Sequence, residues 1–200
     1  MKRISKRGVV FAVVGLLALA SGSAILASRL AGSPPDPAAL DKAVRDAPMT
    51  RVADIAAAGA LPKRGAFVQV TSTGQVCLWD AASADSNGKQ GGCNDAGDPL
   101  AGAKVFASLS YDGGPAAAAV KDARLIGLAD PSVERVSVLM SDGTYREMAL
   151  EGAKIQGRSY RAFGYRFRPS DLRRGLGPVA VLALDASGAE VDRQSTGFGD

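Results

Sequence analysis

From about Pro62 onward, short strand-like runs alternate with turn signals, and this spacing is the strongest constraint on the fold. Each run is rich in β-branched, aromatic or alternating apolar residues, and clusters of Gly, Asp, Asn, Ser or Pro separate it from the next. The expected strands span residues 66–70, 75–79, 104–111, 122–129, 133–140, 144–150, 159–168, 177–185 and 189–193. No helical pattern of about ten residues alternates with them, so the sequence predicts a mainly β fold, an antiparallel β-sandwich that is immunoglobulin-like or related.

The N-terminus carries a different signal. After the basic start KRISKR, residues 9–27 are uncharged and mainly apolar. As a helix this stretch would rise about 28 Å, close to the hydrocarbon thickness of about 30 Å, so it has the length of a transmembrane anchor. It also fits a signal peptide cleaved near Ala20, because the sequence ALA is followed there by the small polar run SGS. The sequence leaves both interpretations open.

The distribution of charge orients this segment. Four cations precede it and Arg29 follows it, which predicts a single-pass protein with residues 31–200 outside the cytoplasm. The rest of the chain holds 19 of the 24 Lys and Arg residues and all 20 Asp and Glu residues. A domain this close to neutral has no general attraction for nucleic acid. The abundance of Ala, Gly and Arg over Lys indicates a bacterial source of high GC content.

Between the two signals lie two short stretches with helical periodicity. Asp36 and Pro37 are a good N-cap and first residue for a helix that we expect to end before Pro48. A second helix is expected over residues 50–59. The predicted organisation is therefore an anchor or signal peptide (1–30), a linker with a short helical stalk (31–61) and an extracytoplasmic β-sandwich (62–200).

The two cysteines agree with export. Cys77 and Cys93 are the only cysteines, and an even number in an exported chain predicts a disulfide. Closing a loop of this length stabilises a fold by about 3 kcal/mol in the chain-entropy model. Trp79 follows Cys77 by two residues, so both should lie on one face of their strand, and we expect that face to point into the core.

Composition excludes much catalytic chemistry. The chain contains no His, which removes Ser-His-Asp and Cys-His nucleophiles and His-ligated zinc. There is no phosphate-binding loop. Ser86 and Lys89 match S-x-x-K, but in a Gly-rich loop instead of at a helix start. Calcium would need oxygen ligands, and the candidates near this loop are Asp85, Asn87, Asn94, Asp95 and Asp98. Their spacing does not match the calcium-binding loop of an EF-hand. We predict no cofactor and no metal site.

Carboxylate catalysis does not require His, so it remains an alternative. The candidates by residue type are Glu134, Glu147, Glu151 and Glu190. The first two lie beside Arg135 and Arg146 on alternating strands, which is typical of solvated faces with surface ion pairs.

The segment from residue 158 to residue 174 has the largest local charge imbalance, with six Arg and a single acid, Asp171. Strand alternation predicts a core face with Phe163, Tyr165 and Phe167, and an exposed basic face on the other side. The candidate binding strip on that exposed face consists of Tyr160, Arg166, Arg168, Arg173 and Arg174. Such a strip suits an acidic wall polymer, anionic lipid head groups or an acidic protein surface. The alternative without a binding role is an exposed strand kept soluble by its arginines.

Together these features predict a non-catalytic, membrane-anchored, extracytoplasmic binding or interaction module of the bacterial cell envelope. Its expected partners are the membrane, through the N-terminal segment, and an envelope protein or acidic wall polymer. The alternatives are a carboxylate-dependent hydrolase of cell-wall glycan and a structural subunit of an envelope assembly, the latter favoured by an exposed apolar patch.

Overall fold

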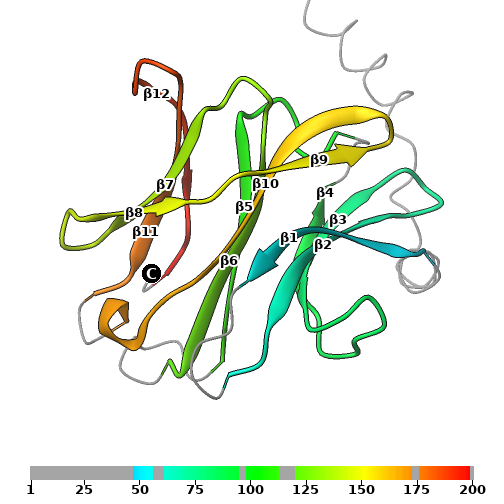
Figure 1. Cartoon of the computed structure of the whole chain (residues 1–200), viewed down its shortest axis with the longest axis horizontal. Helices are drawn as coiled ribbons and strands as arrows, with labels where there is room; N and C mark the ends of the chain where they lie inside the picture. Colours follow the sequence, from blue (N-terminus) through cyan, green and yellow to red (C-terminus); the bar gives the residue numbers. More distant parts are fainter. Residues whose placement is uncertain (1–46, 56–60, 95–97, 113–119, 173–175, 199–200) are drawn as a thin grey trace, which may run out of the picture. The chain divides into compact units, whose positions relative to one another are not determined.

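The computed structural model describes residues 47–55, 61–94, 98–112, 120–172 and 176–198, and within them it contains three antiparallel sheets of four strands each. Sheet I has the strand order β1-β2-β3-β4, sheet II the order β5-β6-β10-β9, and sheet III the order β12-β11-β7-β8. Figure 1 shows the sheets as successive layers, with sheet II in the middle. The prediction of a mainly β, antiparallel fold is confirmed.

The strands of sheet I are β1 (Met49–Ile55), β2 (Arg64–Val70), β3 (Val76–Ala81) and β4 (Gln90–Asn94). Those of sheet II are β5 (Val105–Asp112), β6 (Asp122–Ala129), β9 (Glu151–Ile155) and β10 (Arg158–Arg166). Those of sheet III are β7 (Arg135–Met140), β8 (Tyr145–Met148), β11 (Pro178–Leu184) and β12 (Glu190–Ser195). A single turn of 3-10 helix, Pro169–Asp171, follows β10.

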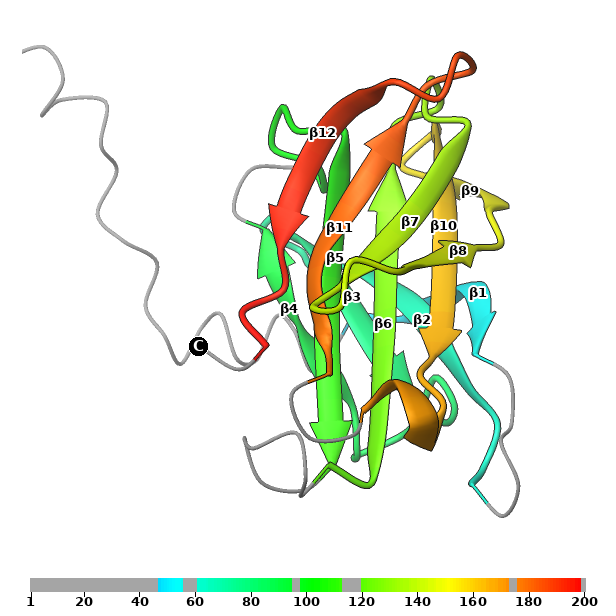
Figure 2. The same ribbon diagram turned by 90° about the vertical axis from the view of Figure 1, so that its left-hand side faces the viewer.

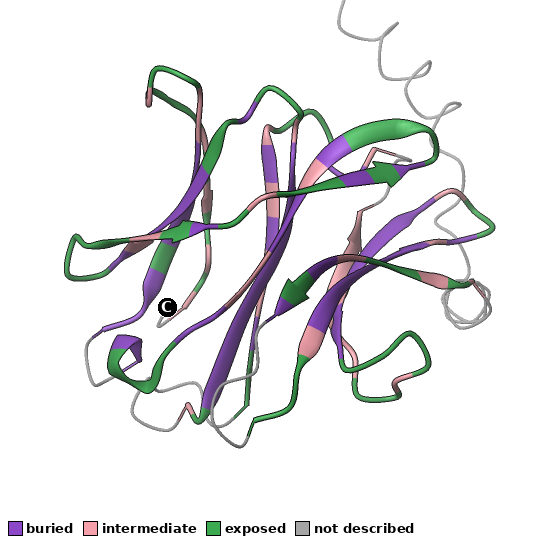
Figure 3. Cartoon of the chain, viewed as in Figure 1, coloured by how far each residue is buried: buried purple, intermediate pink, exposed green. Residues whose placement is uncertain are grey.

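Sheet II is central because both of its faces are covered. On β6, Ala123 and Leu125 belong to a first core against sheet III, whereas Ile126 and Leu128 belong to a second core against sheet I. This division follows from strand geometry, since successive side chains point to opposite faces. Every residue of β6 is buried, as the unbroken purple strand in Figure 3 shows.

All nine predicted strands are present, but three others were not predicted: β1, β4 and β9. The helix expected over residues 50–59 is wrong for residues 50–55, which form β1 and pair with β2. A bulge between Arg51 and Ala53 brings Val52, Ala53 and Ile55 against the second core. The sequence instead suggested a helical face with Val52, Ile55 and Ala56. The β structure thus begins before residue 62, within the predicted stalk.

Three predicted features lie outside the described residues: the anchor or signal peptide (9–27), the first helix up to residue 46, and the arginines Arg173 and Arg174. In the part of the chain that is described, no helix has the length and apolar character needed to cross a membrane.

The disulfide is confirmed. Cys77 on β3 lies directly opposite Cys93 on β4, with their Cα atoms 3.8 Å apart, so the bond joins neighbouring strands. Cys77 and Trp79 do share a face of β3, but that face points away from the second core, which β3 contacts through Val76 and Leu78. Cys77 is nevertheless completely buried, whereas Trp79 is half-buried. The expected burial is therefore confirmed for Cys77 and not for Trp79.

Sheets II and III are also joined along one side, where β12 crosses the edge of β5 (Figure 2). The Asp192 carboxylate accepts hydrogen bonds from the backbone N–H of Lys104 (2.6 Å) and Val105 (3.1 Å). The Gln194 amide accepts from the N–H of Ala107 (2.7 Å) and donates to its carbonyl (2.8 Å). These side chains satisfy backbone groups that an edge strand would otherwise offer to another chain.

Gly127 provides a direct test of the first core. A Cβ atom at this position would lie 1.9 Å from the Phe163 ring, which covers the glycine from the neighbouring strand. We expect Gly127→Ala to lower the free energy of unfolding by about 1–3 kcal/mol, because the ring must leave its packed position. Urea unfolding followed by circular dichroism measures this change.

Gly152→Ala is the matched control, since Gly152 lies on β9 of the same sheet and a Cβ there meets nothing within 4 Å. The control should remain within about 1 kcal/mol of the wild type or gain stability. Equal losses in both variants would contradict the described packing of Phe163.

Candidate functional site

A buried ionic cluster joins sheets I and II at one end of their interface. Arg124 on β6 lies between Ser110 on β5 and Arg166 on β10 in the strand register, so these three side chains share the face toward sheet I. Asp80 approaches from β3 of sheet I and is completely buried. The other members are Asp112, Asp122, Arg64 and Gln90.

Arg124 is the centre of the cluster. Its Nε donates to Asp80 Oδ2 at 2.5 Å, and its Nη1 donates to Asp112 Oδ2 at 3.0 Å and to Asp122. Arg166 Nε lies 3.2 Å from Asp122 Oδ1, which makes Asp122 a bridge between two strands of sheet II. Buried charges persist in proteins when they are paired and hydrogen-bonded in this way.

The cluster favours its charged state. Burial disfavours the charged form of Arg124, but hydrogen bonds to Asp112 and Asp80 outweigh this effect and raise the pKa of the guanidinium. The hydrogen bond from Arg124 lowers the pKa of Asp112, against an opposing effect of burial. A carboxyl whose pKa is lower in the folded chain adds stability above its unfolded pKa, and this stability is lost as pH falls through the folded pKa. The cluster therefore weakens in acid.

The structure places the predicted arginine strip differently from expectation. Tyr160 and Arg166 are 7% and 8% exposed, so the prediction that they form an exposed basic face is wrong. Sheet I covers that face of β10: Tyr160 belongs to the second core and Arg166 to the ionic cluster. Arg168 is exposed, and its backbone N–H donates to Asp171 Oδ2 at 3.0 Å.

The opposite face of β10 agrees with the sequence. Phe163 and Phe167 are buried in the first core, and Tyr165 packs against it. Arg161, on the same face of β10, is half-buried, and its Nη2 lies 3.7 Å from Glu134 Oε2.

The ionic cluster also holds the loop 82–89 that connects β3 and β4. Arg64 Nε donates to Asp80 Oδ1 at 2.6 Å, and its Nη2 donates to the carbonyls of Asp80 (3.1 Å) and Gly88 (3.0 Å). Beside this loop is a cavity of about 570 Å³, here called the loop cavity. Its lining residues are Ala47, Pro48, Met49, Gln69, Ala84, Asp85, Ser86, Asn87 and Lys89.

The S-x-x-K pair lines this cavity without forming a nucleophile. Ser86 Oγ accepts a hydrogen bond from the backbone N–H of Gly88 at 3.2 Å. Lys89 Nζ lies over the Trp79 ring, 4.8 Å from its centre, and donates to Gln69 Oε1 at 3.5 Å. The two side chains thus have other partners, as their place in a loop instead of a helix predicts.

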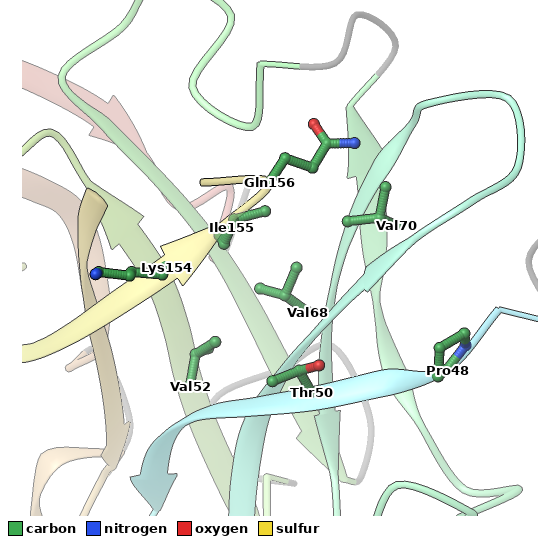
Figure 4. A pocket seen from close by; sticks show the side chains of 8 residues that line it. All are labelled: Pro48, Thr50, Val52, Val68, Val70, Lys154, Ile155 and Gln156. Carbon is green, nitrogen blue, oxygen red and sulfur yellow. The ribbon is translucent and has the colours of Figure 1, made fainter. Parts of the chain in front are cut away.

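A second opening, here called the apolar wedge, lies at the other end of the interface between sheets I and II (Figure 4). It has a volume of about 180 Å³. Its lining residues are Pro48, Thr50, Val52, Val68, Val70, Lys154, Ile155 and Gln156. Beyond it, the backbone N–H of Asp54 donates to Glu151 Oε1 at 3.2 Å, which ties β1 to β9.

The rim of the wedge includes an unusual backbone position. Gln156 has φ of 50°, in the left-handed region that Asn and Gly adopt more easily, and Gly157 follows with φ of 79°. The two residues form the tight connection between β9 and β10. A two-residue hairpin turn of type I′ requires positive φ at both central residues, so these values follow from the turn.

The four glutamates proposed for carboxylate catalysis are exposed and lie on different strands or loops. Glu190 forms an ion pair with Arg193 at 2.8 Å, and hydrogen bonding from that arginine lowers its pKa. A general acid in glycoside hydrolysis needs the opposite shift, toward a raised pKa. Among the described residues, no group of three or more Asp, Glu or Cys side chains is arranged to hold a metal ion.

Comparisons of the chain with protein-family models, with curated proteins and with solved structures found no match.

Sequence reasoning missed the ionic cluster, although a signal was present. Asp80 is in phase with the core residues Val76 and Leu78, and Arg124 is in phase with Ile126 and Leu128. Opposite charges on the inward faces of two strands indicate a buried ion pair between them.

Asp80→Ala tests the cluster. Removing this carboxylate leaves Arg124 and Arg64 without their shared partner, and we expect the free energy of unfolding to fall by about 3–5 kcal/mol at neutral pH. The control Asp54→Ala removes a carboxylate whose ion pairs with Arg51 and Lys63 are exposed, and it should have little effect. Similar unfolding midpoints for Asp80→Ala and the wild type in urea would contradict the cluster's role.

Proposed function

We propose that this chain is a non-catalytic, membrane-anchored binding module of the bacterial cell envelope, with its β domain outside the cytoplasm. The module engages a protein partner through the apolar wedge, which receives one apolar side chain of that partner. The observation that carries this proposal is a preformed opening with apolar side chains at its centre and polar side chains at its rim. It lies between two sheets that the ionic cluster fastens together at their opposite end.

The wedge has the features of a docking pocket. Val68 and Ile155 in its walls belong to the second core, and Val52 packs against that core, so the walls are parts of rigid strands. Thr50 and Gln156 are exposed at the rim and provide polar groups around an apolar centre. A well-packed apolar pocket with a polar rim is the arrangement of an interface hot spot.

The charges of the domain support binding over catalysis. The buried arginines and aspartates are engaged with one another in the ionic cluster. Lowered pKa values at Asp130 and Asp192 arise from hydrogen bonds that these carboxylates accept, in the first case mainly from Ser132 and in the second, against burial, from backbone N–H groups. Carboxyls of this kind stabilise turns and strand edges, and they hold their protons too weakly for general acid catalysis near neutral pH.

The placement in the envelope is inferred from the sequence together with the disulfide. The uncharged segment 9–27 and the cations around it favour an anchor with the domain outside, and a disulfide suits an oxidising compartment. Cleavage near Ala20 would release the same module as a secreted protein.

We further infer that sheets II and III form an antiparallel β-sandwich, immunoglobulin-like or related, to which sheet I is added.

Capture of partners with the full-length chain from its native membrane tests the proposal. Thr50→Phe fills the wedge with a residue that strands accept readily. We expect the wild type to recover one envelope protein in stoichiometric amount and Thr50→Phe to recover at least tenfold less of it. The unfolding midpoint of Thr50→Phe should match that of the wild type.

Val191→Phe is the control for adding an exposed aromatic ring, because Val191 lies on β12 and is 43% exposed. It should recover as much partner as the wild type. Equal recovery by Thr50→Phe would contradict docking in the wedge. If the wild type instead recovers a wall polymer and Arg168→Ser does not, the result would support binding through the exposed arginine of the candidate binding strip.

A further inference from the structure

The loop cavity has a chemical character that the proposed docking in the wedge does not use. Its polar lining comes from Gln69 on β2 and from the loop residues Asp85, Ser86, Asn87 and Lys89. Its volume of about 570 Å³ lies within the range of about 300–1,000 Å³ that is typical of small-molecule sites. The wedge and the loop cavity lie on opposite faces of β1, lined by Thr50 and Met49 respectively.

The base of the loop cavity is built in advance. Gln69 is 2% exposed, its Oε1 accepts from Trp79 Nε1 at 2.8 Å, and its Nε2 donates to the Ala47 carbonyl at 2.5 Å. These bonds fix the amide and also hold the half-buried indole. The loop itself is tied to the ionic cluster through Arg64 and the Gly88 carbonyl. Polar groups held by such supporting bonds need little reordering when a ligand arrives.

The charges and hydrogen-bonding groups define the ligand. Asp85 and Lys89 have opposite charges, so these two side chains together carry no net charge that would favour an anion or a cation. Asp85 only accepts hydrogen bonds and Lys89 only donates, whereas Ser86 and Asn87 do both. A complementary ligand is neutral and presents donors and acceptors at neighbouring positions. Hydroxyl groups on adjacent carbon atoms meet this requirement.

We propose that the loop cavity binds a neutral, polyhydroxylated ligand of the size of one or two sugar rings. A peptide is less suitable, because peptides are usually bound along a sheet edge or through apolar pockets. Gln69 and Trp79 lie on the face of sheet I and not at its edge. The loop cavity shares Pro48 with the wedge but none of its polar lining residues, so ligand binding in the cavity and docking in the wedge can be tested separately.

Trp79 is the only tryptophan of the chain, and its indole N–H donates a hydrogen bond to Gln69, which lines the cavity. Its fluorescence should therefore respond to a ligand in the cavity. The full-length chain, in a detergent without a sugar head group, is titrated with glucose, mannose, galactose and the β-1,4-linked trimer of N-acetylglucosamine up to about 100 mM. We expect a saturable change in emission with at least one of these sugars. Asn87→Leu with Asp85→Asn should weaken the apparent affinity at least tenfold.

Two controls show that the response comes from the cavity. Asp142→Asn removes a similar charge at an exposed turn outside the cavity, and Thr50→Phe fills the wedge; both should keep the wild-type response. No saturable change with any of the sugars would overturn the proposal, as would an equal response in the Asp85 and Asn87 double variant. An equally strong response to a neutral hydrophilic peptide such as Ser-Asn-Ser would overturn the assignment to sugars.

Discussion

The contact between Arg124 and Asp80 is the interaction on which the arrangement of the first two sheets depends. It is buried on both sides, and it joins the most enclosed strand of sheet II to sheet I. A buried charge is tolerated only when its partner is in place. The pair therefore favours one relative position of sheets I and II and destabilises arrangements that separate the two charges. Burial of the apolar residues of the second core, such as Val68 and Leu128, is non-directional, whereas the ion pair requires particular atoms to meet.

Both candidate sites derive from this fastening. At the cluster, Arg64 extends the network to the Gly88 carbonyl and so holds the loop that lines the loop cavity. At the far end of the same interface, Val70 and Ile155 line the apolar wedge, and beyond it the hydrogen bond from the Asp54 N–H to Glu151 ties β1 to β9. A module that binds with preformed openings gains affinity because little ordering is required on binding.

The sequence predicted the central strands of each sheet, whereas the strands that it missed, β1, β4 and β9, all lie at sheet edges. The runs that became β6 and β11 are dense in apolar and β-branched residues, and the cysteine pair was unambiguous. The strand β4 was missed because Gly91 and Gly92 are typical of a loop. In the structure Gly91 is required within the strand, since a Cβ atom at this position would lie 1.9 Å from the Leu78 carbonyl oxygen. The burial of Arg166 could not be foreseen, because it depends on the packing of sheet I against β10 and on an ion pair with Asp122, which is distant in sequence.

Amide hydrogen exchange of the full-length chain with Arg124→Lys tests the central claim most directly. Lysine keeps the charge but lacks the planar fork that reaches Asp80, Asp112 and Asp122 together. If the cluster fastens sheet I to sheet II, exchange should accelerate at least tenfold in β2, β3 and the loop 82–89, while β7 and β11 of sheet III keep wild-type rates. Unchanged exchange in sheet I, or equal acceleration in all three sheets, would contradict the account.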